Sequence, residues 1–167
     1  MRILGIDPGY ATVGYGVIEF KNGRYISINH GAILTSPKCN FSNRLEIIFN
    51  KISEILNEYK PEVSAVEKLY FQSNHKTAID VAQARGVTLL AIQKYNVPIY
   101  EYTPLQVKTS VTGYGKAQKN QMMMMTQKLL KLSELPKPDD TADALAIAIC
   151  HANSSGYHYI NQHFLRA

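Results

Sequence analysis

The sequence predicts an α/β fold in which helices flank the faces of a five-stranded mixed sheet. Short apolar runs typical of buried strands alternate with longer segments whose apolar residues recur at helical spacing, in the order β-β-β-α-β-α-β-α. Asn22-Gly23 lies between two apolar runs and predicts a tight hairpin, because both turn positions favour positive φ. We therefore expect three antiparallel strands followed by two parallel strands that are reached through crossover connections.

Each element follows from its local pattern. The predicted strands are residues 2–7, 14–20, 25–34, 63–67 and 97–102. The predicted helices are residues 42–59, 73–95, 104–111, 118–132 and 139–153. Lys60-Pro61 ends the first helix, whereas Thr103 caps the third and Pro104 begins it. The tail after about residue 153 has no pattern that predicts an element.

Length and composition indicate the class of protein. A chain of 167 residues, 46% of them hydrophobic and 19% charged, fits one globular domain over residues 1–167. A net charge of +5 favours polyanionic partners, nucleic acid first. Cys39 and Cys150 cannot form a disulfide framework, and we interpret both as buried thiols of a reducing cytosol. No apolar run is long enough for a signal peptide or a bilayer span, so we expect a cytoplasmic protein with no membrane contact.

Two predicted strands end in a carboxylate. Asp7 follows the apolar run at residues 3–6 and precedes the turn formers Pro8-Gly9, and Glu67 ends the strand at residues 63–67. If these strands are parallel, both acids emerge at the carboxyl edge of the sheet, where open α/β sheets bind ligands. Two acids at one edge repel each other unless a cation lies between them. The pair therefore predicts a metal site.

Asp140 and Asp143 complete the predicted set of acids. They lie three residues apart on one face of a helix, and the segment that follows, residues 142–150, is apolar nearly all round and predicted to be buried. Acids in a first helical turn also favour the helix dipole, and taken alone the pair is best explained that way. We assign Asp139 to the N-cap of this helix.

Four carboxylates without a neighbouring cysteine or histidine are hard oxygen ligands. Such ligands suit Mg²⁺ or Mn²⁺ and not structural zinc. Two of these ions roughly 3.5–4 Å apart can stabilise the attacking and leaving oxygens of a phosphodiester displacement. The five histidines show no metal-ligand spacing, and we interpret them as surface or packing residues.

Lysines dominate the segment from residue 103 to residue 137, where six of them accompany a single acid, Glu134. Lysines on helices often serve solubility alone. Here they flank a glycine-containing loop beside the predicted acidic site, which favours contact with phosphate. The lysines that we expect to bind DNA are Lys108, Lys116 and Lys119.

Two further features are less specific. Tyr70 and Phe71 follow the strand that ends at Glu67; Tyr70 is equally consistent with core packing and with stacking on a DNA base, and Phe71 favours the core. Four successive methionines at residues 122–125 cover all sides of a helix, and we assign no function to them.

Five motifs occur in a defined order between about residues 2 and 151. They are Gly5-Ile6-Asp7-Pro8-Gly9 with Gly14-Tyr15-Gly16-Val17, then Val66-Glu67, then Gln83-Ala84-Arg85-Gly86-Val87, then Glu101-Tyr102 with Gln106-Val107-Lys108, and then residues 140–148. Through these motifs the sequence resembles the RuvC family, the bacterial crossover-junction endodeoxyribonucleases. The resemblance implies an RNase H-like fold and a homodimer that resolves Holliday junctions by paired symmetric nicks in DNA recombination and repair.

The resemblance also implies roles for individual residues. The metal-binding catalytic acids are Asp7, Glu67, Asp140 and Asp143, which are expected to hold two Mg²⁺ ions, with Mn²⁺ as a substitute. Lys108 and Lys119 correspond to basic residues near the scissile phosphate, and Tyr70 corresponds to an aromatic residue at the junction centre, where phenylalanine is familiar. The helix at residues 73–95 corresponds to the dimer contact, and a branch-migration complex is a candidate partner.

Three alternatives are weighed against this prediction. An actin-like ATPase or sugar kinase shares the opening Ile6-Asp7-Pro8-Gly9, but it needs a second similar domain and a second glycine-rich phosphate loop. A non-catalytic DNA-binding module with a dead site is disfavoured by the complete set of acids. A generic metal nuclease of the same fold, acting on RNA–DNA hybrids or flaps, has the same metal chemistry and stays open.

Overall fold

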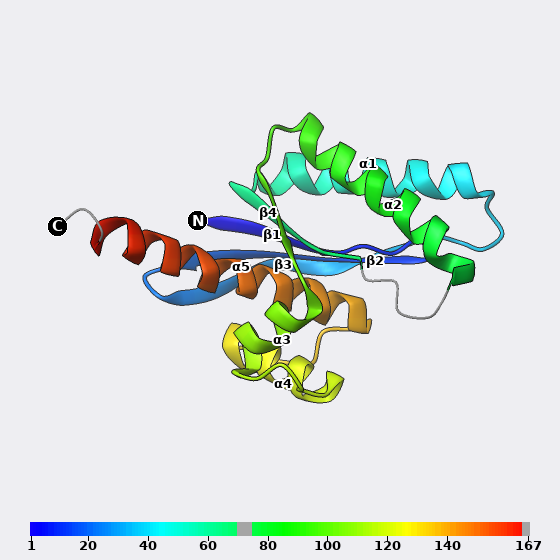
Figure 1. Ribbon diagram of the computed structural model, residues 1–167. Coiled ribbons are helices and arrows are strands. Elements are labelled where there is room, and N and C mark those ends of the chain that lie inside the picture. The colour runs from blue at the N-terminus through cyan, green and yellow to red at the C-terminus, as the bar shows by residue number, and fades with distance from the viewer. Residues whose placement is uncertain (70–74, 165–167) are drawn as a thin grey trace.

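A five-stranded sheet lies between two groups of helices in the computed structural model, which describes residues 1–69 and 75–164 (Figure 1). The strands are β1 (Arg2–Asp7), β2 (Thr12–Lys21), β3 (Arg24–Leu34), β4 (Val63–Glu67) and β5 (Ile99–Tyr102). The helices are α1 (Phe41–Tyr59), α2 (His75–Lys94), α3 (Pro104–Thr112), α4 (Lys119–Leu130) and α5 (Asp139–Phe164).

The strand order is β3-β2-β1-β4-β5. Strand β2 is antiparallel to β1 and to β3, whereas β4 is parallel to β1 and to β5. The predicted mixed sheet of three antiparallel and two further parallel strands is therefore confirmed. The predicted hairpin is present as well, with φ of 51° at Asn22 and 72° at Gly23.

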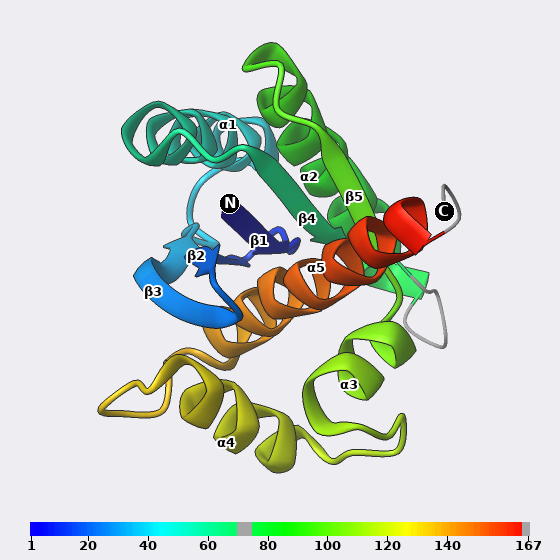
Figure 2. The same cartoon turned by 90° about the vertical axis from the view of Figure 1, so that its left-hand side faces the viewer.

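The central strand β1 is buried on both faces and separates two cores. Leu4 and Ile6 pack toward α1 and α2, and the alternation of a strand sends Ile3 to the opposite face, toward α5. None of these three side chains is exposed. Figure 2 shows α5 beneath the sheet, with α3 and α4 on the far side of α5.

Small residues allow α5 to lie directly on the sheet. A Cβ atom placed on Gly5 of β1 would lie 2.1 Å from the backbone oxygen of Ala144 and 2.8 Å from the backbone nitrogen of Ala148. No side chain fits in that space, so the glycine and alanine positions bring the helix backbone against the strand. The predicted burial of residues 142–150 is confirmed, apart from the half-buried Asp143.

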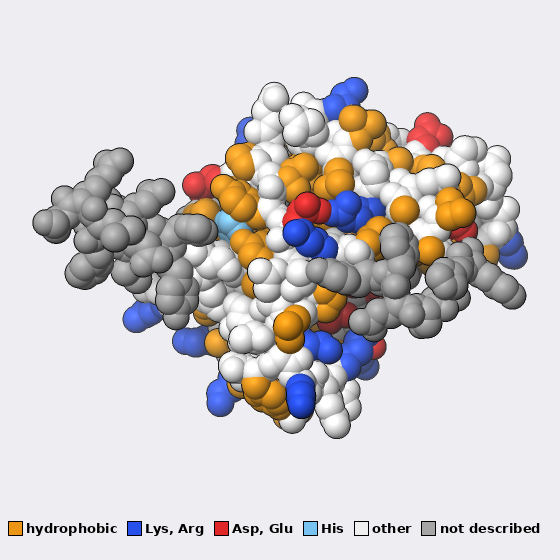
Figure 3. Space-filling model, viewed as in Figure 1, with side chains coloured by type: hydrophobic (Ala, Val, Ile, Leu, Met, Phe, Trp, Pro, Cys, Tyr) orange, Lys and Arg blue, Asp and Glu red, His pale blue; other side chains and the backbone are white. Residues whose placement is uncertain are grey.

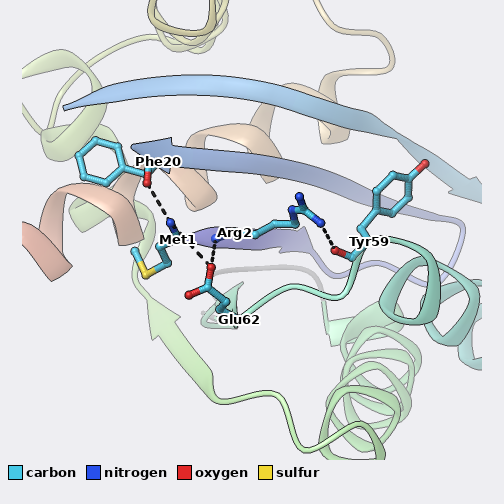
Figure 4. A network of polar contacts seen from close by, with 5 residues as sticks. All are labelled: Met1, Arg2, Phe20, Tyr59 and Glu62. Carbon is cyan, nitrogen blue, oxygen red and sulfur yellow. Dashed lines mark hydrogen bonds and ion pairs between the residues drawn. The ribbon is translucent and has the colours of Figure 1, made fainter. Parts of the chain in front are cut away.

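Polar contacts fix the amino end of β1 (Figure 4). The Met1 ammonium donates to the Phe20 carbonyl oxygen at 3.0 Å and lies 3.7 Å from Glu62 Oε1. The Arg2 amide donates to the same Glu62 oxygen at 2.8 Å, and Arg2 Nη1 donates to the Tyr59 carbonyl oxygen at 2.8 Å. These bonds tie the end of α1 to β1 at the edge opposite the carboxyl ends of the parallel strands.

The predicted start of α3 is correct, whereas the predicted N-cap and the predicted end of α5 are wrong. Thr103 caps α3 as expected: its hydroxyl accepts from the Gln106 amide at 3.1 Å, and the Gln106 side chain accepts from the Thr103 amide at 2.8 Å. The predicted end of the last helix at residue 153 is wrong, because α5 continues to Phe164. The N-cap assignment of Asp139 is also wrong, because Asp139 is the first residue within α5.

The cysteine prediction is half correct. Cys150 is buried, but Cys39 is exposed because it lies in the polar segment that precedes α1. Within residues 1–69 and 75–164, no helix combines the length and the apolar character needed to cross a membrane.

Candidate active site

The strand register places Asp7 and Glu67 side by side. Ile6 of β1 pairs with Val66 of β4 in the parallel ladder. The next residue of each strand therefore leaves the sheet at the same carboxyl edge, and both carboxylates are half-buried there. The two acids that end predicted strands do converge.

A glycine brings the acids of α5 to the same edge. Gly14 of β2 pairs with Asp7, and a Cβ atom on Gly14 would lie 1.9 Å from the backbone oxygen of Asp140. The first turn of α5 consequently rests on the strand partner of Asp7. Asp143 follows almost one turn later and lines a cavity together with Glu67.

The crowding of these acids changes their acidity. Burial, followed by the charges of Glu67, Asp143 and Asp140, raises the pKa of Asp7 from 3.8 to about 8, although Lys119 opposes the rise. Burial and the charge of Asp143 raise the pKa of Glu67 from 4.5 to about 7, against the lowering effects of Asp7 and Lys108. The charges of the other three acids therefore act on Asp7, and a compensating cation would favour the ionised forms of Asp7 and Glu67 near neutral pH.

Lys119, the first residue of α4, supplies part of that compensation. Its Nζ atom lies 3.2 Å from Asp139 Oδ2 and 3.6 Å from Asp143 Oδ2. Partial burial lowers the pKa of Lys119, but the two aspartates outweigh this effect and raise the pKa overall. Burial raises the pKa of Asp143, with Lys119 acting in the opposite direction. The lysine predicted to contact phosphate is thus an internal counter-charge for the acids of α5.

A cavity of about 200 Å³ lies between the acids and the basic helices. Its polar lining residues are Glu67, Lys108, Lys119 and Asp143, and its apolar lining residues are Pro104, Val107, Met122 and Ile147. A second hollow of about 660 Å³ adjoins it, because Glu67, Pro104 and Lys108 line both. Figure 3 shows basic side chains gathered on the part of this face where α3 and α4 lie.

The remaining predicted DNA-binding residues differ in their positions. Lys116 is exposed between α3 and α4, next to Gly115, which lines the larger hollow. Tyr70 lies outside the described residues. His151, interpreted from the sequence as surface or packing, is buried, and its Nδ1 atom lies 2.8 Å from the Tyr102 hydroxyl.

Two features of the site were not predicted from the sequence. Met122, within the methionine run, is buried in the wall of the cavity, whereas Met124 is 63% exposed. The run therefore contributes one side chain to the site. Arg85 and Glu101 also form an ion pair, and Arg85 contacts the backbone of Glu67. Both residues belong to motifs quoted from the sequence.

The donor chemistry of the site fits a hard divalent cation, because all four acids offer carboxylate oxygens. Across residues 1–69 and 75–164, however, no group of three or more aspartate, glutamate, histidine or cysteine side chains is arranged to hold a metal ion as it stands. The like charges repel, and Lys119 pairs with Asp143.

The sheet order, with acids at the ends of β1 and β4 and two more on α5, defines an RNase H-like nuclease domain. The sequence model of the family described as "Crossover junction endodeoxyribonuclease RuvC" matches residues 3–151. The chain belongs to this RuvC family of nucleases.

Individual relatives support the same assignment. The crossover junction endodeoxyribonuclease RuvC of Clostridioides difficile is 54% identical over 155 residues, which cover 93% of this chain and 92% of the relative. The structure of Thermus thermophilus RuvC is 35% identical, with a TM-score of 0.87 and coverage of 95% and 97% of the two chains. A second T. thermophilus RuvC structure, in complex with a Holliday junction substrate, is 36% identical, with a TM-score of 0.88 and coverage of 93% and 94%.

Proposed function

We propose that this chain is a divalent-metal-dependent endonuclease that resolves Holliday junctions by paired symmetric nicks in DNA recombination and repair. The observation that carries the proposal is the convergence of four acids beside two lysines at one edge of the sheet. Membership of the RuvC family, and the relative solved with a Holliday junction substrate, support a four-way DNA junction as the substrate.

The four acids have the chemistry of a two-metal site. The residues that would hold two Mg²⁺ ions, or Mn²⁺ in their place, to stabilise the attacking and leaving oxygens of the phosphodiester are Asp7, Glu67, Asp140 and Asp143. Asp7 would be the central ligand of this site, because the charges of the other three acids all act on it. Lys108 and Lys119 would hold the scissile phosphate. Val107, Met122 and Ile147 form an apolar part of the wall beside these groups.

We assign the exposed face of α2 to a homodimer contact. Ile79 and Leu90 are 67% and 56% exposed. Gly86, between them in sequence, is exposed, and a Cβ atom placed on it would meet nothing within 4 Å. Positions 79, 86 and 90 lie on one side of a helix, together with the exposed Gln83, so the face carries two exposed apolar side chains and has no side chain at Gly86. A two-fold dimer through this face would present two active sites, as paired cuts across a two-fold junction require.

Other assignments follow from the family and from the surface. Tyr70 stays a prediction for contact with the junction centre, and Lys116 is assigned to backbone contact beside the larger hollow. A branch-migration complex stays a predicted partner. The exposed thiol of Cys39 fits a reducing compartment, and we place the protein in the cytoplasm.

The test compares nicking of a four-way junction, a plain duplex and an RNA–DNA hybrid, each with Mg²⁺ and with EDTA. We expect paired nicks in the four-way junction when Mg²⁺ is present, and no cutting of any substrate in EDTA. An Asp7→Asn variant should bind the junction without cutting it, and the matched control Glu46→Gln, at an exposed position of α1, should cut normally. Equal cutting of the hybrid would favour the generic nuclease, and cutting in EDTA would refute the metal-dependent mechanism.

A further inference from the structure

Arg85 of α2 reaches the carboxyl end of β4 and links it to β5. Its Nε atom donates to the backbone oxygen of Glu67 at 3.3 Å. Its Nη2 atom donates to the carboxylate of Glu101 on β5 and forms an ion pair with it. The Arg85 side chain is only 17% exposed, against 40% for Glu101. One guanidinium therefore contacts a backbone acceptor in β4 and a carboxylate in β5.

The backbone contact falls where the sheet ends. Glu67 is the last residue of β4 and pairs with Tyr102 of β5, and beyond it the Lys68 amide donates to the Tyr102 oxygen at 2.8 Å. Strand β5 is an edge strand with one neighbour. The paired register of β1 and β4 ends one residue earlier, at Ile6 and Val66, and Arg85 adds a hydrogen bond to the Glu67 backbone from outside the sheet. A rotation of this backbone would move the Glu67 carboxylate relative to Asp7.

Stability alone does not explain this arrangement. An exposed ion pair contributes little net stability, and a buried one loses much of its Coulombic gain to desolvation. The planar guanidinium, by contrast, donates in fixed directions and satisfies two acceptors at once, which a lysine ammonium on a flexible stem does less well. The geometry therefore favours a role in orientation.

We propose that Arg85, held in place by Glu101, is a positioning residue that orients Glu67 for cation binding. The proposal rests on the function proposed above, in which Glu67 is a metal ligand. Arg85 acts through the backbone of Glu67, as an outer-shell partner does when it fixes the orientation of a ligand. Loss of such a partner commonly weakens metal affinity by about 10–100-fold.

The test uses the full chain and the variants Arg85→Met, Arg85→Lys and Glu101→Gln. The control Lys51→Met removes an exposed ion pair on α1, in which Lys51 Nζ lies 2.6 Å from Glu54 Oε2. Amide hydrogen exchange of Lys68 is measured in EDTA, and Mg²⁺ affinity is measured by calorimetry without DNA. Nicking of a four-way junction is then followed against Mg²⁺ concentration.

For Arg85→Met we expect faster exchange at Lys68, Mg²⁺ affinity weaker by about 10-fold or more, and a matching rise in the Mg²⁺ concentration for half-maximal nicking. The rate at saturating Mg²⁺ should recover to within about 3-fold of wild type, because orientation and not chemistry is lost. Glu101→Gln keeps an acceptor for Arg85 and should change Mg²⁺ affinity by about 3-fold or less. Lys51→Met should change none of these quantities.

If Arg85→Met does not fold, Arg85→Lys carries the same comparison, with an expected loss of about 3–10-fold in Mg²⁺ affinity. A folded Arg85 variant whose Mg²⁺ affinity stays within about 2-fold of wild type would overturn the positioning role, whatever happens to Lys68 exchange. Wild-type protein that binds Mg²⁺ but does not nick junctions would overturn the proposed nuclease function alone. Wild-type protein that binds no Mg²⁺ would overturn both.

Discussion

Replacing Asp7 with asparagine should stabilise the metal-free protein at alkaline pH while it abolishes nicking. Burial and the charges of three other acids raise the pKa of Asp7 from 3.8 to about 8. A carboxyl group whose pKa is higher in the native state than in the unfolded chain binds more protons in the native state between those two values. The free energy of unfolding therefore falls as pH rises from about 4 to about 8, and no penalty remains below about pH 4.

The size of the effect follows from the same shift. At about 1.4 kcal/mol per pKa unit, the difference between 3.8 and about 8 sets an upper limit of roughly 5–6 kcal/mol on the penalty at pH 8. The substituted asparagine would carry no charge, but its buried amide still loses contact with water. We therefore expect Asp7→Asn to raise the free energy of unfolding at pH 8 by about 2–4 kcal/mol.

Urea denaturation in EDTA between about pH 4 and pH 8.5 tests this reasoning, with Glu46→Gln as the exposed control. The stability curves of wild type and Asp7→Asn should coincide near pH 4 and diverge as pH rises. Saturating Mg²⁺ should stabilise wild type by about 2.7 kcal/mol at 100 times its dissociation constant, and Asp7→Asn far less. A wild-type stability that rises from pH 5 to pH 8, or a variant no more stable than wild type at pH 8, would refute the argument.

Three further substitutions test other parts of the site. Gly14→Ala should push away the first turn of α5, and we expect about 1–3 kcal/mol less stability in urea and nicking reduced by more than about 100-fold. Lys119→Met removes a charge that lowers the pKa of Asp7, so the acid limb of the nicking–pH profile should move to higher pH. Leu90→Arg should convert dimers to monomers in sedimentation velocity and abolish paired cutting, with Mg²⁺ binding retained.

The sheet and the convergence of the acids could be predicted because they depend on local patterns. Apolar runs define the strands, Asn22-Gly23 defines the hairpin, and parallel strands that end in Asp7 and Glu67 must bring these residues to one edge. The glycines of the first motif were also visible in the sequence. Their purpose became clear only from the structure, where Gly14 contacts the backbone of α5.

The parts that could not be predicted depend on contacts between distant residues or on weak local signals. Ser154, Ser155 and Gly156 interrupt the apolar pattern and have low helix propensity, so the sequence predicted an early end to α5. Arg85 and Glu101 lie sixteen residues apart on different elements, and no periodicity pairs them. The contacts of Lys119 with two aspartates likewise arise only when α4 packs against the start of α5.

The predicted loss of stability at alkaline pH and the proposed cation binding have the same physical cause. The glycine positions on β1 and β2 allow α5 to approach the sheet, and this close approach forces its acids into the same environment as Asp7 and Glu67. Burial of Asp7, together with repulsion among the acids, disfavours ionisation of Asp7 in the metal-free fold, and Lys119 offsets this effect only in part. A bound divalent cation would compensate the remaining negative charge. Its binding would therefore be favoured by the same unfavourable electrostatic free energy that lowers the stability of the metal-free protein. A variant that removes the charge of Asp7 without displacing α5 should therefore gain stability at alkaline pH and lose cation affinity together.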